Sequence, residues 1–223
     1  MIKIVGERII DLIPFQKGIL FVLKEKTADG QNKISFYSFD MFTQTMAGVT
    51  KNAYLLTKFG PAYAAITACL DDYISCAAQK LNDGRTFVCF SNGEVGIFDE
   101  RGELQHASQV RYDDAPLREA ATDGSFVWCT VPDKNCVVRY NVIKQRIDMR
   151  IGDPATASVE RPVSISVYDN NLFVCCRNTN TLKMIRLDDC SISDYTQFDE
   201  PVLQYLRVGS VEFAVLQSGV YLL

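Results

Sequence analysis

A short pattern recurs along the chain: a turn of small polar residues, four mostly apolar residues and then a polar position. The apolar runs are LFVL, FVCF, FVWC, FVCC and FAVL, at residues 20–23, 87–90, 126–129, 173–176 and 213–216. Successive strand residues point to opposite faces of a sheet, so an uninterrupted apolar run predicts a strand buried on both faces. Parallel sheets between helices usually supply such strands. Because this sequence has few helical segments, it instead predicts sheets packed against sheets on both sides.

Each run has a predicted strand before it and another after it. The preceding strands are RIIDLIPF, DYISCAAQ, PLREAAT, RPVSISVY and PVLQYLRV, and the following ones are KISFYSFD, EVGIFDE, CVVRYNV, LKMIRLD and GVYLL. The runs start 67, 39, 47 and 40 residues apart. Three of these spacings are close to the roughly 40–50 residues of a four-stranded propeller blade.

The repeat pattern resembles that of β-propellers of the broad WD40/NHL-like kind, over nearly the whole chain. WD dipeptides and G-H signatures are absent, so the resemblance names no narrower family. It implies an all-β fold with a single domain, residues 1–223, built from five four-stranded antiparallel blades. The last repeat ends at GVYLL without a fourth strand, and the spare N-terminal strand MIKIV is predicted to complete it, the closure known as Velcro. Six blades and a β-sandwich are the alternatives.

The segment 52–71 does not fit the repeat. It lies between the first and second copies and adds about 20 residues to a blade-length spacing of about 40–50. The sequence allows an extended outer strand with a long connection, a short helix beginning near Pro61, or a degenerate sixth blade.

Charge and hydropathy exclude several classes of protein. The 23 basic and 27 acidic side chains give a net charge of −4, which argues against a nucleic-acid-binding protein. No stretch approaches the roughly 18 apolar residues that a membrane span requires. Charged residues interrupt the apolar start MIKIVGERIIDLIPF, so we expect no signal peptide and a cytoplasmic location.

The eight cysteines form no C-x-x-C pair, and His106 is the only histidine, placed in a polar connection. Zinc sites draw on closely spaced cysteine and histidine ligands. We therefore expect reduced cysteines buried in the core, no metal site and no cofactor. Cys175 and Cys176 would then pack on opposite faces of one strand, and Trp128 would also be a core residue.

Asp11 and Glu119 lie on predicted innermost strands, where a sugar-cleaving propeller would carry its carboxylates. Equivalent strands offer no third carboxylate, so the sequence favours a non-catalytic protein and assigns no catalytic residue. Aromatic residues do not recur at one position, which argues against a repeated sugar-binding site.

Long loops on a rigid frame are typical places for binding. The longer connections, 27–32, 131–135, 152–160 and 52–71, are expected on one rim, and the tight turns at 16–18, 82–84, 122–124 and 169–171 on the other. The long-loop rim would also carry Lys24, Arg118, Arg161 and Arg177, the predicted binding residues, with Arg8 nearby. The sequence favours a module that binds a protein partner; a carbohydrate- or small-molecule-binding propeller, possibly a glycoside hydrolase, is the alternative.

Overall fold

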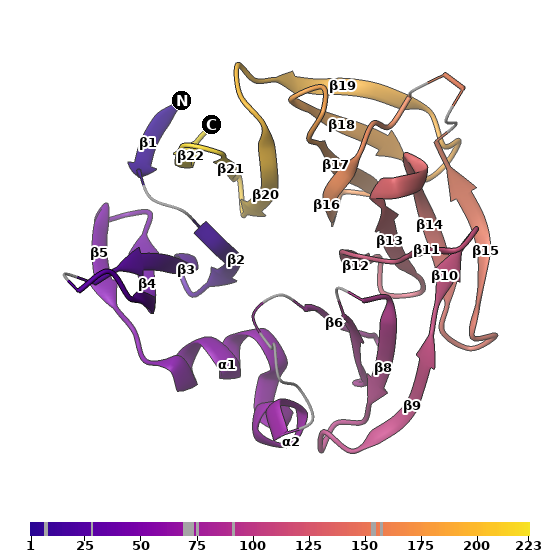
Figure 1. Ribbon diagram of the computed structural model, residues 1–223, viewed down its shortest axis with the longest axis horizontal. Helices are drawn as coiled ribbons and strands as arrows, with labels where there is room; N and C mark the ends of the chain where they lie inside the picture. Colours follow the sequence, from indigo (N-terminus) through magenta and orange to yellow (C-terminus); the bar gives the residue numbers. More distant parts are fainter. Residues whose placement is uncertain are drawn as a thin grey trace.

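Each of the five apolar runs lies wholly or mostly in the second strand of a four-stranded antiparallel sheet, and the five sheets stand around a central axis (Figure 1). The computed structural model describes residues 1–6, 9–27, 29–68, 74, 76–90, 92–152, 155–156 and 158–223. The chain is therefore a five-bladed β-propeller, as the repeat spacing predicted, and neither a β-sandwich nor a six-bladed ring.

The first four blades follow one another along the chain, from the innermost strand outward. Blade 1 contains β2 (Ile9–Phe15), β3 (Gly18–Lys26), β4 (Asn32–Asp40) and β5 (Thr45–Gly48). Blade 2 contains β6 (Ala77–Lys80), β7 (Thr86–Cys89), β8 (Glu94–Phe98) and β9 (Leu104–Gln109). Blade 3 contains β12 (Ala120–Thr122), β13 (Val127–Val131), β14 (Cys136–Asn141) and β15 (Arg146–Ile151). Blade 4 contains β16 (Pro162–Tyr168), β17 (Asn171–Cys176), β18 (Thr181–Arg186) and β19 (Ile192–Gln197).

Blade 5 takes strands from both ends of the sequence. Its strands are β20 (Val202–Val208), β21 (Val211–Leu216), β22 (Gly219–Leu222) and β1 (Ile2–Val5). The N-terminal strand β1 pairs with β22, with Ile2 opposite Leu222. A Cβ on Gly219 would lie 1.9 Å from the Val5 carbonyl oxygen, so only glycine permits this close approach. The predicted Velcro closure is confirmed.

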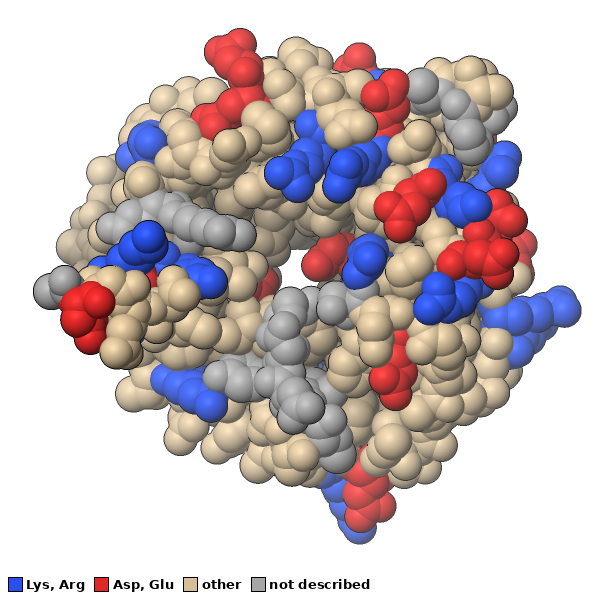
Figure 2. Space-filling view, viewed as in Figure 1, with Lys and Arg blue, Asp and Glu red and all other residues tan. Residues whose placement is uncertain are grey.

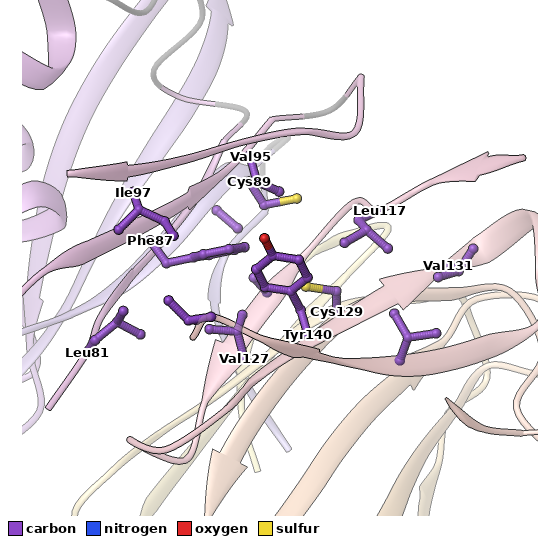
Figure 3. Packing of buried hydrophobic residues seen from close by; sticks show 14 of the residues in the cluster. Leu81, Phe87, Cys89, Val95, Ile97, Leu117, Val127, Cys129, Val131 and Tyr140 are labelled. Atoms are coloured by element: carbon purple, nitrogen blue, oxygen red, sulfur yellow. The ribbon is translucent and has the colours of Figure 1, made fainter. Parts of the chain in front are cut away.

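The core lies between the blades, and the adjacent cysteines show how. Cys175 packs in the cluster shared with blade 5, beside Tyr205 and Ala214. Cys176 packs in the cluster shared with blade 3, beside Trp128. The two neighbours in sequence are thus buried on opposite faces of β17. An equivalent cluster between blades 2 and 3 contains Cys89 and Cys129 (Figure 3).

The segment between blades 1 and 2 is helical. It forms α1 (Lys51–Phe59), the short 3₁₀ turn η1 (Gly60–Ala62) and α2 (Tyr63–Ala68), which lie between the two blades (Figure 1). Tyr54 and Phe59 of α1 and Ile66 of α2 are buried against Val22 and Val88. Pro61 stands in η1, but the helical segment begins at Lys51, so a start near Pro61 was wrong for the first helix. The helices fill a wide gap between two blades, and they replace the proposed sixth blade.

Blade 3 also departs from the predicted strand pattern. The strand expected from Pro116 is regular only from Ala120, because Pro116 belongs to a small hairpin of β10 (Arg111–Tyr112) and β11 (Ala115–Pro116). A second 3₁₀ turn, η2 (Pro132–Lys134), connects β13 to β14. Among the described helices, none has the length and apolar character needed to cross a bilayer.

Candidate functional site

The innermost strands of all five blades surround a central cavity of about 610 Å³. Its lining comes from β2, β6, β12, β16 and β20, with Thr57 and Lys58 from α1 and Arg177 from the end of β17. The cavity lies on the axis of the ring, where every blade contributes one strand. A site here is built from strands of every blade.

Three of the innermost strands share a bulge at the same place. The register with the second strand shifts at Ile10, Val163 and Leu203, each followed by a polar residue that lines the cavity. Those polar residues are Asp11, Ser164 and Gln204. A bulge commonly redirects a side chain next to a functional site. The repeated bulge therefore marks one level of the channel as polar.

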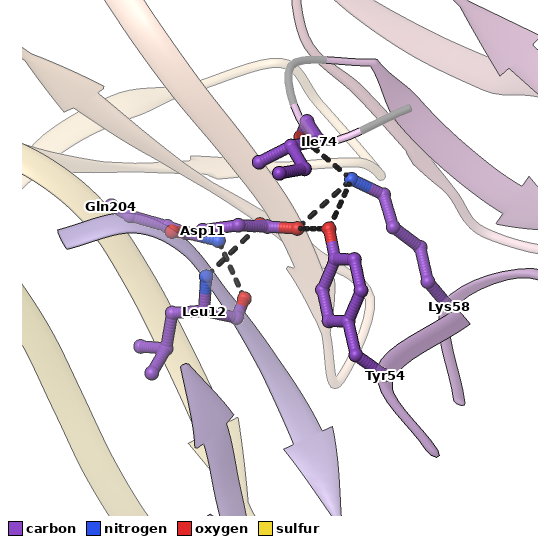
Figure 4. Close-up of polar contacts among 6 residues, drawn as sticks. All are labelled: Asp11, Leu12, Tyr54, Lys58, Ile74 and Gln204. Carbon is purple, nitrogen blue, oxygen red and sulfur yellow. Dashed lines mark hydrogen bonds and ion pairs between the residues drawn. The ribbon is translucent and has the colours of Figure 1, made fainter. Parts of the chain in front are cut away.

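Asp11 is the centre of a buried polar network at this level (Figure 4). Its Oδ2 atom accepts hydrogen bonds from the Tyr54 hydroxyl at 2.6 Å and from the Lys58 ammonium at 2.9 Å. Its Oδ1 atom accepts from the backbone N–H of Leu12 at 2.9 Å. Lys58 also donates to the Tyr54 oxygen at 3.1 Å and to the Ile74 carbonyl at 2.9 Å. The three donors of an ammonium group are thus all used.

Burial and charge act in opposite directions on Lys58. Its side chain is only 6% exposed, and that of Asp11 is 14% exposed. Burial is the largest single influence and disfavours the charged ammonium, but the charge and hydrogen bond of Asp11, together with smaller effects of Cys76 and Glu119, outweigh it and raise the pKa of Lys58 above its ordinary value. Lys58 is therefore a cation at neutral pH.

Our sequence interpretation did not identify Lys58 or Tyr54 as site residues. Both belong to α1, and they lie four residues apart on one face of it, as helical spacing requires. The signal was present in the sequence. Thr50 caps the helix, its side chain accepting from the N–H of Ala53 at 3.2 Å, and it precedes the apolar positions Tyr54, Leu55 and Phe59 at helical spacing.

Glu119 also lines the cavity, just before β12. Thr130 holds its backbone from both sides: the Glu119 N–H donates to the Thr130 Oγ1 at 3.1 Å, and the Glu119 carbonyl accepts from the Thr130 N–H at 2.9 Å. Within the described chain, the Glu119 carboxyl has no hydrogen bond or ion pair. Burial, with the negative charge of Asp11, raises the pKa of Glu119 to about 7, and Lys58 partly offsets this rise.

The two carboxylates considered from the sequence therefore do reach one cavity, and they interact electrostatically. Among the cavity residues that the structure describes, these two are the only acidic ones. Asp11 is neutralised by Lys58, whereas Glu119 is not paired. One half-ionised carboxyl beside a closed ion pair can hold a proton, accept one from a ligand or bind a cationic group.

The predicted binding residues Lys24, Arg118, Arg161 and Arg177 separate into two places. The Arg177 N–H donates to the Arg161 carbonyl at 3.2 Å, so these two exposed residues are neighbours at the start of blade 4. Half-buried Arg118 lies on the adjacent blade 3, where its N–H donates to the Thr130 carbonyl at 3.1 Å. Lys24 is exposed near the end of β3 in blade 1, which does not adjoin blade 4.

Figure 2 shows the face of the ring around the central opening. Lysine and arginine side chains gather around this opening, and acidic side chains are visible in its walls. Arg177 is both exposed and part of the cavity lining. A ligand in the cavity therefore meets both the positive charge of Arg177 and the carboxyl of Glu119.

Other candidate chemistry is absent from the part of the chain that the structure describes. It contains no group of three or more histidine, cysteine, aspartate or glutamate side chains arranged to hold a metal ion. Seven cysteines are free thiols, six of them buried and Cys190 half-buried, while Cys69 lies outside the described residues. His106 lies on β9 and not in a connection as predicted; it is half-buried, with Nε2 3.0 Å from the Ser108 hydroxyl oxygen.

The comparisons with known proteins identify the fold. No protein-family model matches the chain, and no curated protein matches it in sequence. Solved structures that are similar include a streptogramin B lyase, with 12% identity, a TM-score of 0.56 and coverage of 95% of this chain and 78% of the other. Virginiamycin B lyase from Staphylococcus aureus has 12% identity, a TM-score of 0.54 and coverage of 91% and 74%.

A third similar structure is the hydrazine synthase of Kuenenia stuttgartiensis. It has 16% identity and a TM-score of 0.52; the match covers 64% of this chain and 42% of the hydrazine synthase chain. At identities this low, the likeness shows a shared fold and not a shared activity. The chain is a five-bladed β-propeller, and these comparisons place it in no narrower family.

Proposed function

We propose that the protein binds a small polar molecule in its central cavity, which the ligand enters from the long-loop rim. One observation carries this proposal: the cavity of about 610 Å³ contains an unpaired carboxyl, Glu119, beside the Asp11–Lys58 ion pair. Small-molecule sites typically measure about 300–1,000 Å³ and combine apolar walls with a few polar groups. Aliphatic residues such as Ile13, Ile165 and Leu206 supply the apolar part of this lining.

The test is a thermal-shift screen with sugars, amino acids and nucleosides, performed on the wild type and on a variant with a filled cavity. Gln79 lies on β6 and lines the cavity, so Gln79→Trp should abolish stabilisation by any compound that raises the Tm of the wild type. Gln105→Trp, on the exposed outermost strand β9, is the matched control and should leave it intact. A ligand that stabilises the Gln79→Trp variant equally binds elsewhere, and the proposal would be wrong.

The protein partner predicted from the sequence is a second candidate, supported by the adjacent, exposed Arg161 and Arg177. Together they form a positive patch on an acidic protein, which suits an acidic protein surface. Arg161→Glu with Arg177→Glu should weaken binding of such a partner at least several-fold at low salt, because steering by exposed charges is screened by salt.

A control for this second candidate must place the same charge reversal on the opposite rim. Asp123 is unsuitable, because its carboxylate accepts from the Trp128 indole N–H at 3.0 Å and from the backbone of its own turn. Arg101→Glu with Lys144→Glu changes exposed turn residues on the tight-turn rim. If this control pair abolishes binding and the Arg161 and Arg177 changes do not, the long-loop rim is the wrong surface.

A further inference from the structure

The Asp11–Lys58 pair has no capacity left for a ligand charge. Lys58 gives its three donors to Asp11, Tyr54 and Ile74. Both carboxylate oxygens of Asp11 accept hydrogen bonds. The two charges cancel within a closed network, so this pair shapes the wall of the cavity and does not attract an ion.

Glu119 is different because its backbone is fixed and its carboxyl is not used. Both backbone hydrogen bonds to Thr130 hold the residue in place. Within the described residues its carboxyl has no partner, and Lys58, whose charge acts on it, is already engaged by Asp11. A desolvated carboxylate gains most from a cationic hydrogen-bond donor, since such a group restores both the charge balance and the hydrogen bonds lost from water.

The entrance selects for the opposite charge. Arg177 lines the cavity, and Arg161 is its backbone neighbour. A simple amine would be repelled by these two guanidinium groups, whereas a simple anion would be repelled by ionised Glu119. A molecule that carries both charges can pair its cationic group with Glu119 and its carboxylate with Arg177. Guanidinium groups bind carboxylates in a two-pronged geometry.

We propose that the ligand of the central cavity is a zwitterion, an amino acid or short peptide, whose ammonium group binds Glu119 and whose carboxylate binds Arg177. The inference rests on the proposed function and specifies its ligand class. Among the described residues that line the cavity, the charges come from four places: Asp11 on β2, Lys58 on α1, Glu119 before β12 and Arg177 after β17.

Isothermal titration calorimetry with the standard amino acids and alanyl-alanine tests this ligand class. Each zwitterion that binds is compared with its N-acetylated form, which lacks the ammonium group, and with its C-terminal amide, which lacks the carboxylate. We expect either change to weaken binding by about tenfold or more, the loss typical of a hydrogen bond to a charged group. Glu119→Gln should remove the preference for the free amine, and Arg177→Gln the preference for the free carboxylate.

Proton release gives a readout that a merely structural role would not produce. Binding of an ammonium group favours ionised Glu119, so the wild type should release protons near neutral pH, seen as a dependence of the binding enthalpy on the buffer. The Glu119→Gln variant should release none. Gln is close in shape to Glu, so we expect the variant to fold. The midpoint of its unfolding in urea checks this.

The outcomes separate this inference from the proposed function. N-acetylated forms that bind as tightly as the free amines would overturn the inference. So would a wild type that binds none of these zwitterions but binds a sugar lost in Gln79→Trp, although this result would support the proposed function. If no compound of either panel binds the wild type, both are wrong.

Discussion

The Lys58 ammonium and the Asp11 carboxylate lie 2.9 Å apart and join the inserted helix α1 to the innermost strand of blade 1. Removing one member of a buried ion pair leaves the other charge uncompensated, which typically costs about 3–5 kcal/mol. We expect Lys58→Met and Asp11→Leu each to lower the free energy of unfolding by about 3 kcal/mol in urea titrations. The double variant should lose less than the sum of the two.

The exposed pair of Arg85 and Asp83 is the control for this experiment. The Arg85 side chain is 33% exposed and that of Asp83 is 51% exposed. Surface ion pairs contribute about 0–1 kcal/mol, so Arg85→Ala should change stability little. Equal effects at Lys58 and Arg85 would show that the channel network is not buried in solution.

Glu119 should make the protein less stable as the pH rises toward neutrality. Its pKa is about 7 in the folded protein, against an ordinary value of 4.5. Below pH 4.5 it is protonated in both states and there is no penalty. Between these values the unfolded chain loses the proton first, so folding stability falls by about 3 kcal/mol as the pH rises through the folded-state pKa.

The difference between the wild type and Glu119→Gln isolates this contribution, because the other titrating groups are common to both. Urea unfolding between pH 4 and pH 8 should show the variant gaining stability relative to the wild type as the pH rises. Parallel profiles would mean that Glu119 is solvated and titrates normally.

The repeat architecture could be predicted because the same sequence pattern recurs in each blade. A four-residue run such as Phe173–Cys176 is apolar throughout only because blades cover both faces of the strand, and this requirement recurs in every copy. The position of Asp11 on an innermost strand followed from that alignment. The repeat also explains why Cys175 and Cys176 stand side by side without any shared chemistry.

The site itself could be predicted only in part. Asp11 and Glu119 were recognisable as inner-strand carboxylates, but the partner of Asp11 comes from a segment with no counterpart in other blades. Nothing in a repeat alignment places Lys58 against β2; that contact depends on α1 packing between two blades. The position of His106 on an outer strand was also missed. Outer strands such as β9 are largely polar, and their sequences resemble those of loops.

The cysteines provide a test of the blade packing. Burial raises the pKa of the Cys175 thiol well above its ordinary value and that of Cys176 to about 11, and the reactive species is the thiolate. In a Cys69→Ser background, a thiol reagent should label half-buried Cys190 first in the native protein and all seven remaining cysteines after denaturation. Rapid native labelling of Cys89, Cys129, Cys175 and Cys176 would contradict the packing.

Shortening the Cys175 side chain tests the same packing through the stability of the protein. Cys175 is fully buried among Phe173, Tyr205 and Leu216. Cys175→Ala should therefore leave a small cavity and lower the free energy of unfolding by about 1 kcal/mol. Cys190→Ala, at the half-buried position, should cost less.

Closure of the ring depends on β1 and on Gly219. Deleting residues 1–6 removes β1 and leaves β22 as an exposed edge strand, which invites self-association. We expect a marked fall in Tm and oligomers in size-exclusion chromatography. Gly219→Ala should act in the same direction, because the added Cβ would meet the Val5 carbonyl oxygen.

A conservative change on the same strand serves as the reference. Ile2 is 63% exposed, so Ile2→Thr should change stability by no more than about 0.5 kcal/mol. A deletion variant as stable and monomeric as the Ile2→Thr protein would show that β1 does not close the ring.

The pairing of β1 with β22 also determines how the molecule responds to tension. The two strands are antiparallel, with Ile2 opposite Leu222 and Val5 opposite Val220, so residues 2 and 222 lie at the same end of the ladder. A force that pulls these two residues apart acts across the strands and opens their hydrogen bonds one pair at a time. The pairing of β1 with β22 therefore stabilises the closed ring but resists this force weakly. Stretching would separate β1 from β22 before any complete blade unfolds.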